Sequence, residues 1–222
     1  MRVNTREADS DGANKGMDVG TGSLPRIPRF NASGVLPPFV GSNPGQSAPM
    51  MSPYLTDIRE FVERFGFSKE RRAIMRGLLG FRGALREVGL DEGFQWLDGS
   101  FVEDIESSTR HRAPGDVDVV TFVRRPAACR VEADWKRFNQ ENFSLLHDVA
   151  AVKERFRCDA YTVDLDIEAE SLVDSTRYWF GLFSHQRATC QWKGILRIPL
   201  AAHADRSALE WLNEMSDQDE EY

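Results

Sequence analysis

Residues 96–120 read WLDGSFVEDIESSTRHRAPGDVDVV. An apolar run ends at Gly99 and Ser100, a charged polar loop follows, and a second apolar run opens with Asp116 and Asp118. Apolar and other residues alternate too regularly in the second run for a helix, and a period of two predicts a strand. In such a strand the valines between the aspartates point to one face, and both aspartates point to the other. The stretch therefore predicts two strands joined by a loop, with paired carboxylates on one strand face.

The two aspartates, Asp116 and Asp118, place their Cβ atoms roughly 6–7 Å apart on a strand. Unpaired carboxylates at this spacing repel, and one of them tends to take up a proton unless a cation bridges the pair. Hard oxygen ligands suit Mg²⁺, which completes its shell with waters and substrate phosphates. At Gly99 and Ser100, backbone N–H groups and a hydroxyl are free to approach phosphate oxygens. Together these features indicate a metal-nucleotide site, whereas the aspartate pair alone also fits an ordinary polar strand face.

The bulk composition is that of a globular protein. With 222 residues, 41% of them hydrophobic, the chain is long enough for one domain with its own core. No apolar run approaches the roughly 18 residues of a membrane helix, and the first twenty residues lack the apolar centre of a secretory signal. The three cysteines (Cys129, Cys158 and Cys190) match no zinc or disulfide spacing, which favours free thiols and a cytoplasmic location. A net charge of −7 argues against non-specific coating of duplex nucleic acid.

The chain divides by composition into three parts. Residues 1–34 are rich in Gly, Ser, Asn and Pro, and we expect a disordered or extended segment. Residues 35–215 form the expected domain, onto which GVLPPFVG at its start docks with its apolar side chains. Residues 216–222 form an acidic tail that ends in a tyrosine.

Helices and strands are expected to mix along the domain without regular alternation. Ser52 is the expected N-cap of a first helix, with Pro53 at its first position, and Ser68 is the N-cap of a second. Ser207 and Glu210 form a capping box for the last helix. Strands are expected at FQWL, DVDVVTFV, RCDAYTVDLDI and KGILRIPL, and further helices at residues 132–156 and STRYWFGLFSHQR. This order indicates an α+β fold with a mixed sheet flanked by helices.

A third carboxylate is offered by the strand RCDAYTVDLDI, which contains Asp159, Asp164 and Asp166. Asp159 and Asp164 are separated by an odd number of residues, so they face opposite sides of a regular strand. Asp159 at the start of the strand is favoured, and Asp164 is the alternative.

The candidate cations are Arg110 and Arg112 in the loop STRHR, together with Lys193. The two arginines either cover a triphosphate or belong to a solvated loop. Lys193 follows Trp192, so a base stacked on the indole would bring phosphate to the lysine. The alternative places Trp192 in the core and Lys193 on the surface.

The motif LDGSF…PGDVDVV resembles the signature of the polymerase-beta-like nucleotidyltransferase superfamily, an apolar-Gly-Ser segment followed by Asp-apolar-Asp-apolar. The resemblance implies that fold and a two-metal phosphoryl transfer with Mg²⁺, or with Mn²⁺ in its place. Carried over by position, Gly99 and Ser100 hold the triphosphate and Asp116 and Asp118 hold the metal, with Asp159 as the third ligand. The fifteen residues between the two halves are at the long end of the superfamily pattern.

The last residue, Tyr222, follows a run of acidic residues. Acidic tails are often solubilising ends. Next to a nucleotidyltransferase signature, a terminal tyrosine also suits a protein primer, in cis or from a neighbouring subunit.

From GVLPPFVG to GILRIPL the chain resembles compact bacterial nucleotidyltransferases, and the terminal tyrosine makes it similar to the nucleotidyltransferases of Hailong anti-phage defence. That resemblance implies template-independent synthesis of short single-stranded DNA from dATP, primed at Tyr222, and a DNA product that restrains a membrane effector. The protein itself is not expected to insert into the membrane. Two alternatives stay open: a nucleotidyltransferase that modifies a protein, an RNA 3′ end or a small molecule, and a catalytically silent binding subunit.

Overall fold

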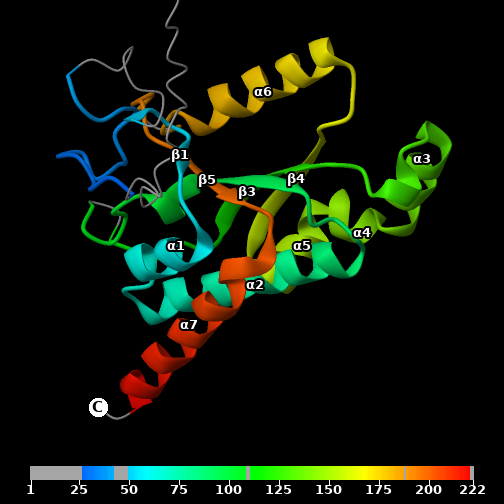
Figure 1. The fold of residues 1–222 in the computed structure, drawn as a ribbon. Coiled ribbons are helices and arrows are strands. Elements are labelled where there is room, and N and C mark those ends of the chain that lie inside the picture. The colour runs from blue at the N-terminus through cyan, green and yellow to red at the C-terminus, as the bar shows by residue number, and fades with distance from the viewer. Residues whose placement is uncertain (1–26, 43–49, 109–110, 188, 221–222) are drawn as a thin grey trace, which may run out of the picture.

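The computed structural model describes residues 27–42, 50–108, 111–187 and 189–220. Within them the strands form one five-stranded mixed sheet with the order β1-β5-β2-β3-β4 (Figure 1). The strands are β1 (Tyr54–Leu55), β2 (Gly93–Asp98), β3 (Val117–Val123), β4 (Cys158–Asp164) and β5 (Leu196–Pro199). β2 runs antiparallel to β3 and β5, whereas β3 and β4 are parallel, as are β1 and β5. The expected α+β class with a mixed sheet is confirmed.

The helices cover the two sides of the sheet unequally (Figure 1). They are α1 (Ile58–Phe65), α2 (Lys69–Glu87), α3 (Glu132–Glu141), α4 (Phe143–Leu146), α5 (Val149–Phe156), α6 (Ala169–Phe183) and α7 (Asp205–Glu220). Helices α1, α2, α5 and α7 lie on one side of the sheet, and α6 lies on the other. No helix in these described ranges is long and apolar enough to cross a membrane.

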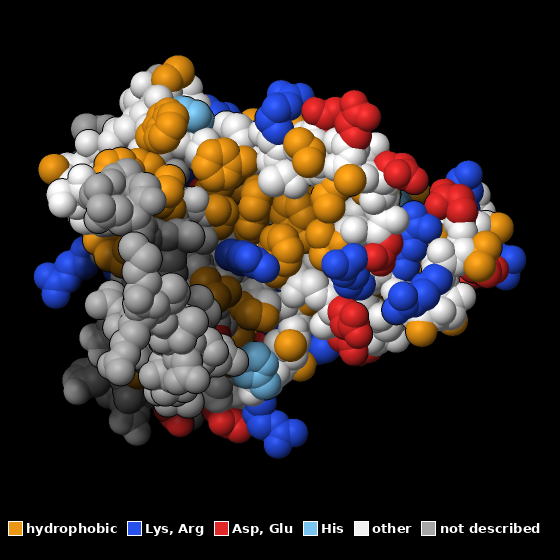
Figure 2. All heavy atoms as spheres, turned by 45° about the horizontal axis from the view of Figure 1, so that its top comes forward, with side chains coloured by type: hydrophobic (Ala, Val, Ile, Leu, Met, Phe, Trp, Pro, Cys, Tyr) orange, Lys and Arg blue, Asp and Glu red, His pale blue; other side chains and the backbone are white. Residues whose placement is uncertain are grey.

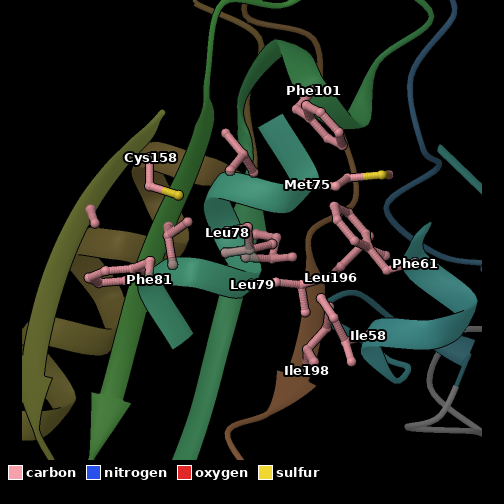
Figure 3. Close-up of a cluster of buried hydrophobic side chains, with 14 of the residues drawn as sticks. Ile58, Phe61, Met75, Leu78, Leu79, Phe81, Phe101, Cys158, Leu196 and Ile198 are labelled. Atoms are coloured by element: carbon pink, nitrogen blue, oxygen red, sulfur yellow. The ribbon is translucent and has the colours of Figure 1, made fainter. Parts of the chain in front are cut away.

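The main core lies between α1, α2 and the sheet. Phe61 of α1 and Leu78 of α2 are completely buried and lie close to Leu196 of β5 in Figure 3. Apolar positions of α2 recur at helical spacing, so one face of this long helix meets the sheet. The domain therefore has its largest apolar contact on the α2 side.

Strand β3 serves both sides of the sheet, as its alternating sequence predicts. Val117 and Val119 belong to the main core, whereas Val120 and Phe122 belong to a smaller apolar cluster under α6. The aspartates of DVDVV share the face of Val120 and Phe122 because the strand period is two. They therefore point to the α6 side.

Two buried arginines of α2 anchor neighbouring segments. Arg82 pairs with Asp205 at the start of α7 (2.8 Å) and donates to the Gln95 side chain of β2. Arg71 pairs with Glu106 (2.6 Å) and donates to the Phe101 carbonyl, which fixes the chain that follows β2. These ion pairs and hydrogen bonds are needed because an unpaired buried guanidinium charge is strongly destabilising.

The segment GVLPPFVG docks on the domain, which confirms the expectation. Val35 and Leu36 are fully buried. The Leu36 carbonyl accepts a hydrogen bond from Gly194 N–H, and Tyr54 Oη donates to the Pro37 carbonyl (2.8 Å). The segment therefore packs beside the start of β5.

The expected cap at Ser52 is wrong. Tyr54 and Leu55 pair with β5, so the chain stays extended beyond Ser52 and α1 begins only after Asp57. The Asp57 side chain accepts a hydrogen bond from Glu60 N–H (2.8 Å) and is the true N-cap. By contrast, Ser68 caps α2 as predicted, through a bond from Arg71 N–H.

The capping box at Ser207 is also wrong. Helix α7 begins at Asp205, and Ser207 lies inside it with its hydroxyl donating to the Ala204 carbonyl. The carboxylate of Asp205 is held at the helix start by Arg82 and Arg86, where negative charge suits the helix dipole. The same helix continues to Glu220, so residues 216–220 of the expected tail are helical.

Candidate active site

Carboxylates from three neighbouring strands lie side by side at one end of the sheet. In the strand register Asp98 of β2 is opposite Asp118 of β3, and Asp118 is opposite Asp159 of β4. Directly opposed residues point to the same face, and Asp116, two residues before Asp118, shares it. The structure thus brings the three predicted aspartates together and adds Asp98, to which the sequence analysis gave no role.

This carboxylate row opens into a pocket of about 760 Å³. Its floor includes Gly99 and Ser100, which follow β2 directly. Arg112 and Ser108 line it from the loop before β3, and Gln186 and Arg187 line it from the chain after α6. Polar and cationic groups therefore face the carboxylates across a space large enough for a small ligand.

Gly99 is required by its backbone and by its neighbour. Its φ of +80° lies in the left-handed region that glycine tolerates best, and a Cβ atom there would lie 1.7 Å from Asp118 Oδ2. The absence of a side chain therefore lets the Asp118 carboxylate pack directly against the turn.

Burial and mutual repulsion shift the acidity of these carboxylates. Burial, with smaller contributions from Asp116 and Asp159, raises the pKa of Asp118 to about 6. Burial also raises the pKa of Asp98 to about 7, and the charge of Lys193 offsets part of that rise. The buried Asp98 Oδ1 atom has no hydrogen-bond partner among the residues that the structure describes. Burial thus favours the protonated form of both carboxylates.

Lys193 lies beneath the turn, and its predicted alternative as a surface residue is wrong. Its side chain is only 4% exposed, with Nζ 3.0 Å from Asp98 Oδ2 and 3.1 Å from Glu103 Oε1. It also donates to the Gly99 carbonyl (3.2 Å). The indole of Trp192 is in turn 59% exposed rather than in the core. Lys193 therefore holds the glycine-serine turn against the carboxylate row.

Lys153 of α5 is a second lysine that sequence reasoning missed. Its Nζ lies 2.5 Å from Asp116 Oδ2 and 3.5 Å from Asp159 Oδ2. Arg157, with a left-handed φ of +55°, ends α5 and leads directly into β4, so the last turns of α5 lie beside the starts of β3 and β4. Hydrogen bonding to Asp116 is the main reason that the pKa of Lys153 is raised.

The remaining predicted site residues differ in whether they lie at the pocket. Asp164 lies on the opposite face of β4 and pairs with Arg125 (2.7 Å), away from the pocket, so Asp159 is the one that joins the row. Arg112 lines the pocket as an exposed residue. Arg110 and Tyr222 lie outside the described residues.

Comparison with known protein families assigns the chain to one family. The model of a family of unknown function, DUF6932, matches residues 28–199. The chain belongs to this family. All residues that line the pocket fall within the matched DUF6932 segment, whereas α7 lies beyond it. No curated protein and no solved structure gives a significant match.

The pocket of this DUF6932 protein has the donor chemistry that Mg²⁺ prefers. Three aspartates supply carboxylate oxygens, and the partnerless oxygen of Asp98 lies in the same wall. In the described part of the chain, no three acidic, histidine or cysteine side chains already have the arrangement of a metal centre. The ammonium group of Lys153 instead lies between Asp116 and Asp159. The carboxylates thus have the ligand chemistry of a divalent-cation site, and in this structure the Lys153 ammonium group pairs with two of them.

Proposed function

We propose that this protein is a magnesium-dependent nucleotidyltransferase with a polymerase-beta-like fold. The observation that carries the proposal is the row formed by Asp98, Asp118 and Asp159 on adjacent strands, which faces a pocket beside the turn at Gly99 and Ser100. A mixed sheet with carboxylates gathered at one end of one face supports the same proposal. The resemblance of LDGSF…PGDVDVV to the superfamily signature adds to it.

Each pocket group has a role in this reaction. Asp116, Asp118 and Asp159 would hold Mg²⁺, which when bound neutralises phosphate charge and acidifies an attacking hydroxyl. The turn at Gly99 and Ser100 offers backbone N–H groups and a hydroxyl to the triphosphate, with no side chain at position 99 in the way.

Cations and an aromatic group at the pocket suit the rest of a nucleotide. Arg112 and Arg187 line the pocket and supply positive charge for phosphate oxygens. The Trp192 indole is 59% exposed and lies edge-on to the His185 ring, with ring centroids 5.5 Å apart. Trp192 lies in the chain between Gln191 and Lys193, which line the pocket, so its exposed indole would be a stacking surface for a nucleobase.

The proposed product is a short single-stranded DNA, made from dATP without a template and primed at Tyr222. In this proposal the enzyme works in the cytoplasm and its DNA restrains a membrane effector in anti-phage defence. These finer features rest on the resemblance to Hailong nucleotidyltransferases and on the terminal tyrosine.

Helix α7 constrains how Tyr222 would reach a pocket. The helix packs on α2, where Arg76 donates to the Leu212 carbonyl and to Ser216 Oγ (2.6 Å each), on the sheet side opposite α6. Two residues beyond Glu220 span about 7 Å when extended. Priming therefore requires either unwinding of α7 or the pocket of a neighbouring copy.

A nucleotide-incorporation assay tests the function. The full chain is incubated with each of the eight labelled ribo- and deoxynucleoside triphosphates, with Mg²⁺ or Mn²⁺. We expect a ladder from dATP that is covalently attached to the protein and absent with EDTA. Transfer of label only to an added protein or RNA would favour the alternative acceptors. No incorporation under any condition would favour a silent binding subunit.

A further inference from the structure

We propose that Lys153 is an exchangeable cation that neutralises the carboxylate row and must withdraw before a divalent cation binds. The inference rests on the proposed function because it concerns the same Mg²⁺ site. It assigns Lys153 a positioning role that neither the sequence motif nor the family match indicates.

The position of Lys153 is that of a bridging cation. One ammonium group lies within 3.5 Å of carboxylate oxygens on both Asp116 and Asp159, which flank Asp118 in sequence and in register. A divalent cation that joined these two aspartates would bind the same two carboxylate groups, and its charge would repel the ammonium group beside it. The ammonium group and the metal therefore compete for the row.

The surroundings of Lys153 allow it to leave. Its side chain is 48% exposed, and its two ion pairs with the row are with carboxylates that are themselves about one quarter exposed. The helix that carries it is fixed separately, by the buried side chains Val152 and Phe156. A long flexible side chain at the pocket mouth can swing away without disturbing α5.

Lys193 provides the contrast within the same pocket. Its side chain is 4% exposed and is held by Asp98, Glu103 and the Gly99 carbonyl. Withdrawal of Lys193 would break its ion pairs with two buried carboxylates, Asp98 and Glu103, which is strongly unfavourable. The two lysines thus have different roles. Lys193 stays bound to the glycine-serine turn, and Lys153 is the cation that exchanges.

Exchange at Lys153 has a consequence for nucleotide binding. Once displaced, the ammonium group still lies at the pocket wall, where a triphosphate supplies a new anionic partner. The metal and the nucleotide should therefore bind cooperatively, because the nucleotide offsets the loss of the two ion pairs.

Calorimetric titration with Mn²⁺ in the absence of nucleotide tests the inference. Lys153→Met keeps the apolar stem but removes the charge, and we expect it to bind Mn²⁺ about fivefold more tightly than the wild type, the scale of a partly exposed ion pair. Lys153→Arg should restore the wild-type affinity. Lys136→Met, which removes a 71% exposed lysine on α3, is the matched control and should bind as the wild type does.

Thermal unfolding gives a second readout that does not depend on activity. With EDTA, Lys153→Met should unfold at a lower temperature than the wild type because its carboxylates have lost their counter-charge, and Mn²⁺ should remove the difference. Equal or weaker Mn²⁺ binding by Lys153→Met overturns the role of Lys153 and leaves the proposed function standing. Absence of Mn²⁺ binding by both proteins overturns the inference and the proposed function together.

Discussion

The two faces of β3 differ in what covers them and in what they carry. Val117 and Val119 point to the α2 side, where both are fully buried in the main core. Asp116 and Asp118 point to the α6 side, where the pocket opens beside them. Figure 2 turns the α6 side forward and shows apolar side chains at the surface of this face, with charged groups around them.

The helices on the two sides of the sheet also differ in how deeply they are buried. Helix α2 buries five large apolar side chains in the main core (Ile74, Met75, Leu78, Phe81 and Leu85). Among the described residues of α6 only Phe183 is buried, and Val173 and Tyr178 are more than half exposed. A well-packed face supplies the free energy that holds the strands in register. That rigidity allows the other face to hold like charges close together, an arrangement that would not persist on a loose scaffold. The comparison predicts that stability and activity can be changed separately by substitutions on the two faces.

The largest effect on stability is expected on the α2 side. Leu78→Ala removes a fully buried side chain from the main core and should lower the free energy of unfolding by about 2–5 kcal/mol. Nucleotide incorporation per folded molecule should stay at the wild-type level, because Leu78 does not line the pocket. Urea denaturation and the incorporation assay at low temperature measure the two effects. A loss of activity beyond the loss of folded protein would mean that the two faces are coupled.

Gly99 shapes the turn after β2 and also lets Asp118 pack against that turn, so its substitution should change both stability and activity. Gly99→Ala forces a side chain into a left-handed backbone and against Asp118, and should cost about 1–2 kcal/mol as well as most of the activity. Gly115→Ala is the matched control, because a Cβ there meets nothing within 4 Å. The two variants are compared by thermal unfolding and by incorporation. Equal behaviour of the two would show that the close approach of Asp118 to the turn is unimportant.

The smallest effect is a dependence on pH that comes from the α6 side. Because the pKa of Asp118 is raised to about 6, the folded protein holds a proton that the unfolded chain releases between about pH 4 and pH 6. This group therefore contributes less stability as pH rises through that window, and Asp118→Asn should gain stability relative to the wild type between pH 4.5 and pH 7.5. Urea denaturation in EDTA at the two pH values measures the change.

Asp166 supplies a control of opposite sign for the pH experiment. Burial is the largest single influence on its pKa and raises it, but hydrogen bonds from Arg125 N–H and the Arg124 side chain, with the charges of Arg124 and Arg130, together lower the pKa. Its contribution is present above the pKa of the unfolded chain, about 3.9, and is lost as pH falls through the lower pKa of the folded state. Asp166→Asn should therefore cost nearly the same stability at pH 7.5 and pH 4.5, and less at about pH 3. Identical pH trends for the two variants would contradict the electrostatic account of the carboxylate row.

Much of the fold could be predicted from local pattern. The alternation in DVDVVTFV assigned the two faces of β3 correctly, and Ser68 was recognised as a cap. The caps expected at Ser52 and Ser207 are wrong because tertiary contacts decide where these helices begin. Pairing with β5 keeps Tyr54 extended, and the buried Arg82 fixes the start of α7 through Asp205. Neither of these tertiary contacts can be predicted from local residue types alone.

The site could be predicted only in part, because some of its residues are brought together by tertiary contacts. Asp116, Asp118 and Asp159 follow from strand alternation and the motif. Asp98 stands in the quoted stretch, but its place opposite Asp118 depends on the register between β2 and β3, which one sequence does not reveal. Lys153 lies on α5 and contacts the carboxylate row because α5 turns directly into β4. No sequence spacing predicts this contact.

The most direct test of the central claim compares two carboxylates on one strand. Asp159 and Asp164 both belong to β4, but Asp159 faces the pocket and Asp164 pairs with Arg125 on the other side. We expect Asp159→Asn to lower Mg²⁺-dependent incorporation by on the order of a hundredfold or more while the protein stays folded. Asp164→Asn should lower stability and keep the activity of the folded fraction. Full activity in Asp159→Asn, or an equal loss of activity in both variants, would contradict the claim that the α6 side of the sheet carries the chemistry.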